Sequence, residues 1–152
     1  MKLKLKFMGK MLEERRGNLL DCRDHIAHCV AIDMEMGAGV ASQIRKKFIS
    51  SEEIQNFTTM KPKIGECFIV ETDVGKIFNV VTKPSSRRSR PTKEGFKLAI
   101  DNLFELMNEL GVRKINIPKL GCGLDRLSWD GFVKPLLQQK VSLGFDIIVW
   151  VI

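Results

Sequence analysis

The chain has 152 residues, of which 44% are hydrophobic and 28% are charged, and its formal net charge is +7. That length suits one domain, expected to span residues 1–152, and the composition argues against intrinsic disorder. No apolar run approaches the roughly 18 residues that a transmembrane helix needs, so we expect no membrane segment. Four cysteines without a dense framework favour free thiols in a reducing compartment, and hence a cytoplasmic protein.

Strand patterns and helical periodicities alternate along the chain. In chain order, we predict strands at 3–8, 12–16 and 25–30, helices at 38–48 and 51–58, strands at 66–71 and 77–82, a helix at 93–110, a strand at 112–117, a helix at 128–140 and a strand at 145–151. The strand predicted at 3–8 alternates lysines with apolar residues and lacks the continuous apolar core of a signal peptide. This order predicts an α/β fold with a mixed, largely parallel sheet between layers of helices.

Two of these elements have the clearest patterns. The helix at 93–110 follows Pro91 and Thr92, ends at Gly111, and repeats apolar residues every three or four positions: Phe96, Ala99, Leu103, Leu106, Met107 and Leu110. The tail 145–152 is almost continuously apolar, which indicates a strand covered on both faces. The helix would therefore bury one face and the last strand both.

Two pairs of glycines follow predicted strands. Gly37 and Gly39 lie at the start of a helix, and Gly121 and Gly123 lie between a strand and a helix. Glycine permits sharp turns and close approach of the backbone, and open N–H groups at a helix N-terminus bind anions. A single pair more often marks a tight turn, whereas two pairs favour a bent diphosphate, as in a nucleotide sugar. Neither pair fits a P-loop or a dinucleotide-binding GxGxxG motif.

Two titratable residues accompany these loops. Lys83 ends a predicted strand, and Asp125 follows the second glycine pair, at the sheet edge where open α/β folds bind ligands. Each has a simpler explanation, since a lysine at a strand end is usually an exposed charge and an aspartate often forms a turn or caps a helix. If the fold joins them, they form a nucleophilic amine and a proton-transfer partner.

A cluster of potential metal ligands comprises Cys22, His25, His28 and Cys29. In a strand, His28 and Cys29 point to opposite faces, so convergence on one metal is difficult. We favour buried thiols, a hydrogen-bonded His28 and no metal. Cys122, which has no histidine near it in the sequence, is interpreted as a small filler rather than a reactive thiol.

The positive charge is densest at Arg87, Arg88 and Arg90, flanked by Lys83 and Lys93. Such a run is either a solvated surface loop or a patch that guides a phosphate-bearing substrate. No aromatic residue interrupts it, which weakens the case for stacking on single-stranded nucleic acid.

Seven segments give the chain a family resemblance from about Gly17 to the C-terminus. They are Gly17–Leu20, Ala27–Cys29, Met36–Ala41, Arg45–Phe48, Thr82–Lys83, Pro91–Thr92 and Pro118–Leu127. In this order they resemble a macrodomain of the terminal ADP-ribose protein glycohydrolase type, related to macrodomain antitoxins that remove ADP-ribose from DNA. The glycines and Asp125-Arg126-Leu127 of the last segment are the most specific part.

The resemblance implies a single three-layer α/β/α macrodomain that binds ADP-ribose without a metal or cofactor. Gly17–Leu20 would meet the adenine, Gly37–Val40 the distal ribose and diphosphate, and Leu120–Leu124 the diphosphate. The implied ligand-binding residues are Asn18, Leu19, His28, Met36, Gly37, Ala38, Gly39, Val40, Pro118, Leu120, Gly121, Cys122, Gly123 and Leu124. Lys83 matches the family's catalytic lysine, which attacks the anomeric carbon of the distal ribose, and Asp125 matches the carboxylate that handles protons.

Two positions depart from the family pattern. Asn18 stands where an aspartate is usual, and Ala31 where a small hydroxyl residue is common, so both bear on affinity more than on catalysis. The expected function is removal of ADP-ribose from acidic side chains of modified protein, with related activity on O-acetylated or phosphorylated ADP-ribose. The alternatives are hydrolysis of ADP-ribosylated DNA bases, with Arg87, Arg88 and Arg90 contacting DNA, and a non-catalytic ADP-ribose reader. We expect a monomer.

Overall fold

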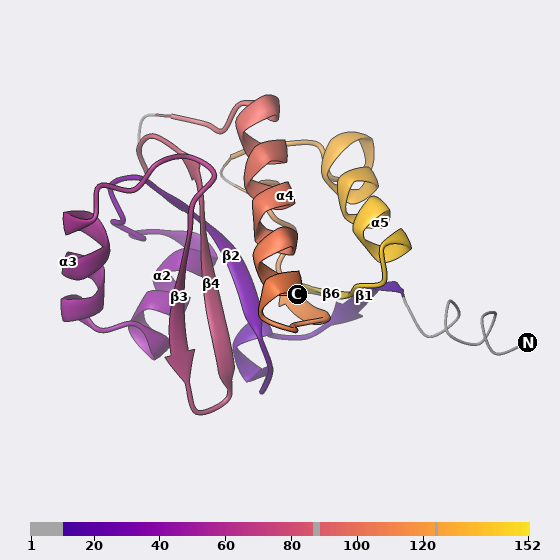
Figure 1. The fold of residues 1–152 in the computed structure, drawn as a ribbon, viewed down its shortest axis with the longest axis horizontal. Coiled ribbons are helices and arrows are strands. Elements are labelled where there is room, and N and C mark those ends of the chain that lie inside the picture. The colour runs from indigo at the N-terminus through magenta and orange to yellow at the C-terminus, as the bar shows by residue number, and fades with distance from the viewer. Residues whose placement is uncertain (1–10, 87–88, 124) are drawn as a thin grey trace, which may run out of the picture.

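A six-stranded sheet forms the centre of the computed structural model, which describes residues 11–86, 89–123 and 125–152 (Figure 1). The strand order is β1-β6-β5-β2-β4-β3, and all neighbouring strands are parallel except β3 and β4. The strands are β1 (Leu12–Arg16), β2 (Ile26–Ala31), β3 (Cys67–Thr72), β4 (Gly75–Lys83), β5 (Lys114–Ile117) and β6 (Asp146–Val151). The predicted mixed, largely parallel sheet is thus confirmed.

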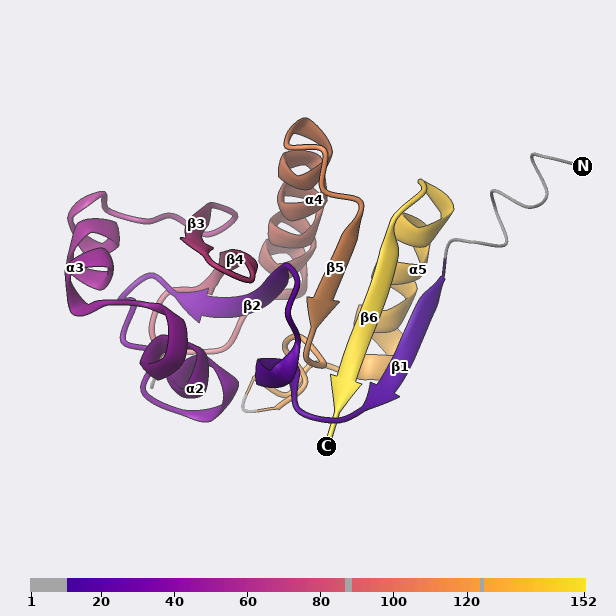
Figure 2. The same cartoon turned by 90° about the horizontal axis from the view of Figure 1, so that it is seen from below.

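Helices cover both faces of the sheet, and Figure 2 shows α2 and α4 on opposite sides of β2. The helices are α2 (Gly39–Phe48), α3 (Ser51–Thr59), α4 (Lys93–Glu109) and α5 (Lys134–Ser142), with a short 3-10 turn η1 (Leu19–Asp21) and a π-helical turn η2 (Trp129–Val133). Alternate strand residues enter two separate cores. Phe78 and Val80 face α4 and α5, whereas Ile77 and Val81 face α2 and α3. The result is the predicted three-layer α/β/α arrangement.

Most predicted elements are confirmed, with differences at their ends. The helix predicted at 128–140 is instead η2 followed by α5, and η1 was not predicted. Leu110, assigned to the apolar face of the helix at 93–110, is 44% exposed because α4 ends before it. In β6, Ile147, Ile148 and Val149 are buried, as expected for a covered strand, but Trp150 is partly exposed. The strand predicted at 3–8 lies outside the described residues.

A polar pair crosses the centre of the sheet between β2 and β4. His28 Nε2 lies 2.5 Å from Asn79 Oδ1, while the Asn79 amide nitrogen donates to the Phe68 carbonyl at 2.9 Å. Because Asn79 Oδ1 can only accept, Nε2 carries the imidazole proton and Nδ1 is an acceptor. Burial lowers the pKa of His28 to about 4, against the opposing effect of the Asn79 hydrogen bond. His28 is therefore neutral at physiological pH, and its predicted hydrogen bond is confirmed.

The loop after β5 packs against α4 at a glycine that has no room for a side chain. Gly121 has a φ of +70°, and a Cβ there would lie 2.8 Å from Leu127 Cδ1 and 2.9 Å from Phe96 Cε2. The Leu127 amide donates to the Gly121 carbonyl at 2.7 Å, which closes the loop on itself. Gly123, two residues on, has open space around the Cβ position.

The buried imidazole makes stability depend on pH. Unfolded His28 binds a proton below its ordinary pKa of 6.5, but folded His28 binds one only below about 4. The free energy of unfolding should therefore fall by up to about 3 kcal/mol from this group as the pH drops through that window. Urea denaturation of wild type and His28→Gln across that window measures the difference. If the free energy of unfolding changed equally with pH in the two proteins, His28 would not contribute to this pH dependence.

Gly121→Ala should destabilise the fold, because it adds both a backbone strain and a steric contact with buried Phe96. We expect a loss of about 1–3 kcal/mol in the free energy of unfolding, measured by chemical denaturation. Gly123→Ala is the matched control and should change it by less than about 1 kcal/mol. A neutral Gly121→Ala would contradict this description of the loop.

Candidate functional site

A cavity of about 650 Å³ lies at the carboxyl ends of β2, β4 and β5. It lies at the sheet edge where open α/β folds bind their ligands. Twelve of the predicted site residues line it: His28, Met36, Gly37, Ala38, Gly39, Val40, Lys83, Pro118, Leu120, Gly121, Gly123 and Asp125. The fold thus brings both glycine loops and both titratable residues to one cavity.

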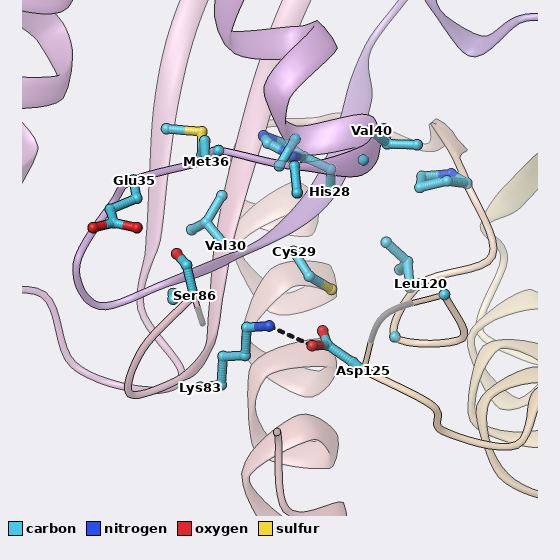
Figure 3. Close-up of a pocket in the computed structure, with 18 of the residues that line it drawn as sticks. His28, Cys29, Val30, Glu35, Met36, Val40, Lys83, Ser86, Leu120 and Asp125 are labelled. Atoms are coloured by element: carbon cyan, nitrogen blue, oxygen red, sulfur yellow. Dashed lines mark hydrogen bonds and ion pairs between the residues drawn. The ribbon is translucent and has the colours of Figure 1, made fainter. Parts of the chain in front are cut away.

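Lys83 and Asp125 form an ion pair across this cavity (Figure 3). Lys83 is the last residue of β4, and Asp125 lies on the loop after β5, 42 residues further along the chain. Their side chains are only 11% and 12% exposed. An amine and a carboxylate that touch in a largely enclosed site have the geometry for nucleophilic attack with local proton transfer.

A β-bulge turns Lys83 toward the cavity. Val30 pairs with Val81, but the next residue of β2, Ala31, pairs with Lys83, so Thr82 is the extra residue. Paired residues of neighbouring strands present their side chains on the same face, and Ala31 also lines the cavity. Without the bulge, Thr82 would take this position and Lys83 would point to the opposite face.

The first glycine loop ends in an open helix N-terminus. Ala38 is the N-cap of α2 and makes no side-chain cap hydrogen bond, while Gly39 follows it with a φ of +61°. Met36 also has a positive φ, and the Arg45 guanidinium donates to the Glu35 carbonyl, which braces the loop. Among the described residues no side chain caps the first amides of α2, which lie at the wall of the cavity as in anion-binding helix termini.

His28 adds an acceptor to the same region. It lines the cavity, and its Nδ1 is buried with no hydrogen-bond partner among the described residues. A buried acceptor of this kind is normally satisfied by a donor from water or ligand, such as a hydroxyl group.

The second glycine loop forms the opposite wall. Leu120 is buried, Gly121 and Gly123 line the cavity, and the Cys122 amide donates to the Lys119 carbonyl at 3.2 Å. Cys122 itself does not line the cavity, and burial raises the pKa of its thiol, which fits the filler interpretation. Leu124 lies outside the described residues.

The two residues predicted to meet an adenine do not line the cavity. The Asn18 side chain accepts a hydrogen bond from the Leu20 amide at 2.9 Å and so caps η1, while Leu19 is buried. Lys47 of α2 donates to the Leu20 carbonyl at 2.7 Å, which ties η1 to the helix beneath the first glycine loop. Their contact with a ligand stays a prediction.

Several cavity residues were not predicted as site residues. They are Cys29, Val30, Ala31, Glu35, Ala41, Ser86 and Lys119. Alternation along β2 places Cys29 and Ala31 on one face, and Lys83 joins that face through the bulge in the pairing of β2 with β4. Burial raises the pKa of Cys29 to about 12, and nearby Asp125 acts in the same direction, so this thiol is protonated and a poor nucleophile.

Of the remaining candidates, Cys22, His25 and Arg90 do not line this cavity. Among the described residues, no group of three or more His, Cys, Asp or Glu side chains is placed to hold a metal ion. His25 Nδ1 instead accepts from the Lys76 amide at 2.9 Å. Arg90 is exposed, and Arg87 and Arg88 lie outside the described residues. No helix in the described part of the chain is long and apolar enough to span a membrane.

Comparison with known proteins identifies the family. The Macro domain model matches residues 27–134. The human ADP-ribose glycohydrolase OARD1 is 32% identical over 133 residues, which cover 86% of this chain and 84% of that protein. The DNA ADP-ribosyl glycohydrolase of Thermus aquaticus is 30% identical over 93% of this chain and 41% of its own length.

Solved structures agree with the sequence comparisons. The macrodomain of Thermus aquaticus DarG matches with a TM-score of 0.79 and 28% identity, covering 93% of this chain and 99% of that one. DarTG of Thermosipho africanus, solved in complex with ADP-ribose, has a TM-score of 0.72 and 18% identity, over 91% of this chain and 41% of that one. At that identity the second match speaks to the fold alone. This chain belongs to the macrodomain family.

Proposed function

We propose that this protein is an ADP-ribosyl glycohydrolase that removes mono-ADP-ribose from acidic side chains of modified proteins, with Lys83 and Asp125 as its catalytic residues. The observation that carries the proposal is the ion pair of these two residues in a cavity between two glycine loops. The general activity, hydrolysis of an ADP-ribose linkage, is supported by two relatives that are named as glycohydrolases and are 32% and 30% identical to this chain.

The cavity suits the size and charge of ADP-ribose. Its volume of about 650 Å³ falls within the range of small-molecule sites. The diphosphate would lie against the open amides of α2, with the Leu120–Gly123 loop on its other side. Helix N-terminal amides favour such an anion because they supply donors and the positive end of the helix dipole. The distal ribose would then reach Lys83.

The reaction would begin with loss of a proton from the Lys83 ammonium, because only the free amine has a lone pair to donate. Asp125, in contact with it, is the group placed to accept that proton. The amine then bonds to the anomeric carbon of the distal ribose, and the acidic side chain leaves as a carboxylate. Water adds to the resulting adduct, the carbon–nitrogen bond breaks, and ADP-ribose and Lys83 are released. O-acetylated or phosphorylated ADP-ribose presents a related target.

ADP-ribosylated DNA is the second candidate substrate. The Thermus aquaticus relative is named as a DNA ADP-ribosyl glycohydrolase, and the net charge of +7 favours a polyanion. A nucleobase is a poorer leaving group than a carboxylate. Hydrolysis of this substrate would therefore require more exact positioning of the anomeric carbon beside the Lys83 amine. Exposed Arg90 and its neighbours Arg87 and Arg88 would supply the sequence-independent contacts.

Ala38→Asp should separate fold stability from ligand binding. The extended backbone of Ala38 (φ −147°, ψ 160°) suits a capping aspartate, which would satisfy an open amide of α2 and stabilise the protein by about 1 kcal/mol. The same carboxylate would repel a diphosphate and weaken ADP-ribose binding by about tenfold or more. Denaturation and calorimetry measure the two effects. Unchanged ADP-ribose affinity would place the diphosphate elsewhere.

Lys83→Met and Asp125→Asn should each lower turnover of a glutamate-linked mono-ADP-ribosylated peptide by about a hundredfold or more, because each removes a reacting group. Lys76→Met is the matched control, since Lys76 forms an ion pair with Glu71 at the far end of the same strand. It should retain wild-type turnover.

The same proteins should be assayed on ADP-ribosylated duplex and single-stranded DNA. Full activity of Lys83→Met on the peptide would refute the assigned nucleophile. Faster turnover of DNA than of peptide by the wild type would favour the second candidate. ADP-ribose binding without turnover of any substrate would identify a reader.

A further inference from the structure

The ladder that joins β4 to β2 ends at Lys83. The bulge at Thr82 interrupts the pairing with β2, and beyond it the Ile32 amide donates to the Lys83 carbonyl at 3.0 Å. The next residue is Pro84, which has no amide proton and cannot continue a ladder. The chain after Lys83 is therefore fixed by contacts outside the ladder.

Asp33 supplies these contacts from the loop after β2. Its Oδ2 accepts from the Ser86 amide at 2.8 Å, and its Oδ1 accepts from the Ser86 hydroxyl at 2.5 Å. Oδ1 also accepts from the Glu35 amide at 3.0 Å, which fixes the carboxylate within its own loop. The two bonds from Ser86 join segments 53 residues apart, and Ser86 lies three positions after Lys83.

The Asp33 carboxylate is ionised, which strengthens these bonds. Burial acts to raise the pKa of Asp33, but hydrogen bonds from the Ser86 hydroxyl and amide and the Glu35 amide, together with the nearby Lys83 charge, hold it below its usual value. Hydrogen bonds to an ionised acceptor are stronger than those between neutral groups. Loss of the carboxylate would free Ser86 and remove a negative charge near Lys83.

We infer that Asp33 is a positioning residue for Lys83: by anchoring Ser86, it holds the end of β4 so that the Lys83 amine stays beside Asp125 in the cavity. Asp33 itself does not line the cavity, whereas Lys83 and Ser86 do (Figure 3). It therefore acts through the strand end and not by touching substrate. This inference rests on the proposed function of Lys83 as nucleophile.

The test measures formation of the lysine adduct separately from ligand binding. The protein is incubated with ADP-ribose and cyanoborohydride, which reduces the imine formed between the Lys83 amine and the ribose aldehyde to a stable secondary amine. Mass spectrometry then locates and quantifies the adduct over time. Calorimetry with ADP-ribose gives the affinity, and steady-state assays on the glutamate-linked peptide give kcat and KM.

Asp33→Ala should slow trapping at Lys83 and lower kcat by about tenfold or more, while the affinity for ADP-ribose changes by less than about threefold. Ser86→Ala should have a smaller effect, since the bond from its amide to Asp33 remains. Asp33→Asn should fall between wild type and Asp33→Ala, because its amide oxygen keeps one acceptor.

Asp101→Ala is the matched control, because Asp101 also accepts from two side chains, Lys97 and Lys140, but lies on α4 away from the cavity. Wild-type trapping in Asp33→Ala would overturn the inference. A parallel loss of trapping and of ADP-ribose affinity would overturn it too, since Asp33 would then act on the first glycine loop. Absence of an adduct in wild type would instead refute the proposed nucleophile, and with it the basis of this inference.

Discussion

The contact between Lys83 and Asp125 depends on the parallel arrangement of the sheet. β2 pairs with β4 on one side and with β5 on the other, so the chain after β4 and the chain after β5 emerge at one edge. Each segment carries one member of the pair, and this strand order places the two segments on either side of β2. The ion pair in turn connects the two glycine loops. Asp125 follows the second loop, and Lys83 pairs with Ala31 at the end of β2, the strand that leads into the first loop.

The same edge is built from locally unfavourable conformations. Met34 and Met36 adopt positive φ angles in the loop after β2, Arg126 does so beside Asp125, and β4 is bulged at Thr82. Left-handed backbone at non-glycine residues costs about 1 kcal/mol or more each. Two buried cores, one on each face of the sheet, stabilise the rest of the domain and hold these segments in place. Strain collected around one cavity is the pattern expected where a fold serves ligand binding.

Sequence patterns predict those parts of the site that depend on local chemistry. The glycine pairs mark loops where the backbone can approach a ligand, and the apolar periodicity of α4 gives its buried face. Lys83 and Asp125 are ordinary residue types after strands, and their predicted roles come from the family resemblance. The bulge at Thr82 is not predictable in this way, since it exists only relative to the pairing of β2 with β4. Asp33 and Ser86 are likewise ordinary loop residues until the fold places them together. The exposure of Leu110 reflects where α4 ends, which periodicity does not determine.

The central claim is that Lys83 attacks the anomeric carbon of the distal ribose and not the carbonyl carbon of the ester. Single turnover of the glutamate-linked peptide in water enriched with heavy oxygen distinguishes the two sites of cleavage. Attack at the ribose leaves both original oxygens on the glutamate, so mass spectrometry of the released peptide should show no incorporated label. Heavy oxygen in the glutamate carboxylate would mean that water cleaves the acyl bond, and would contradict the account.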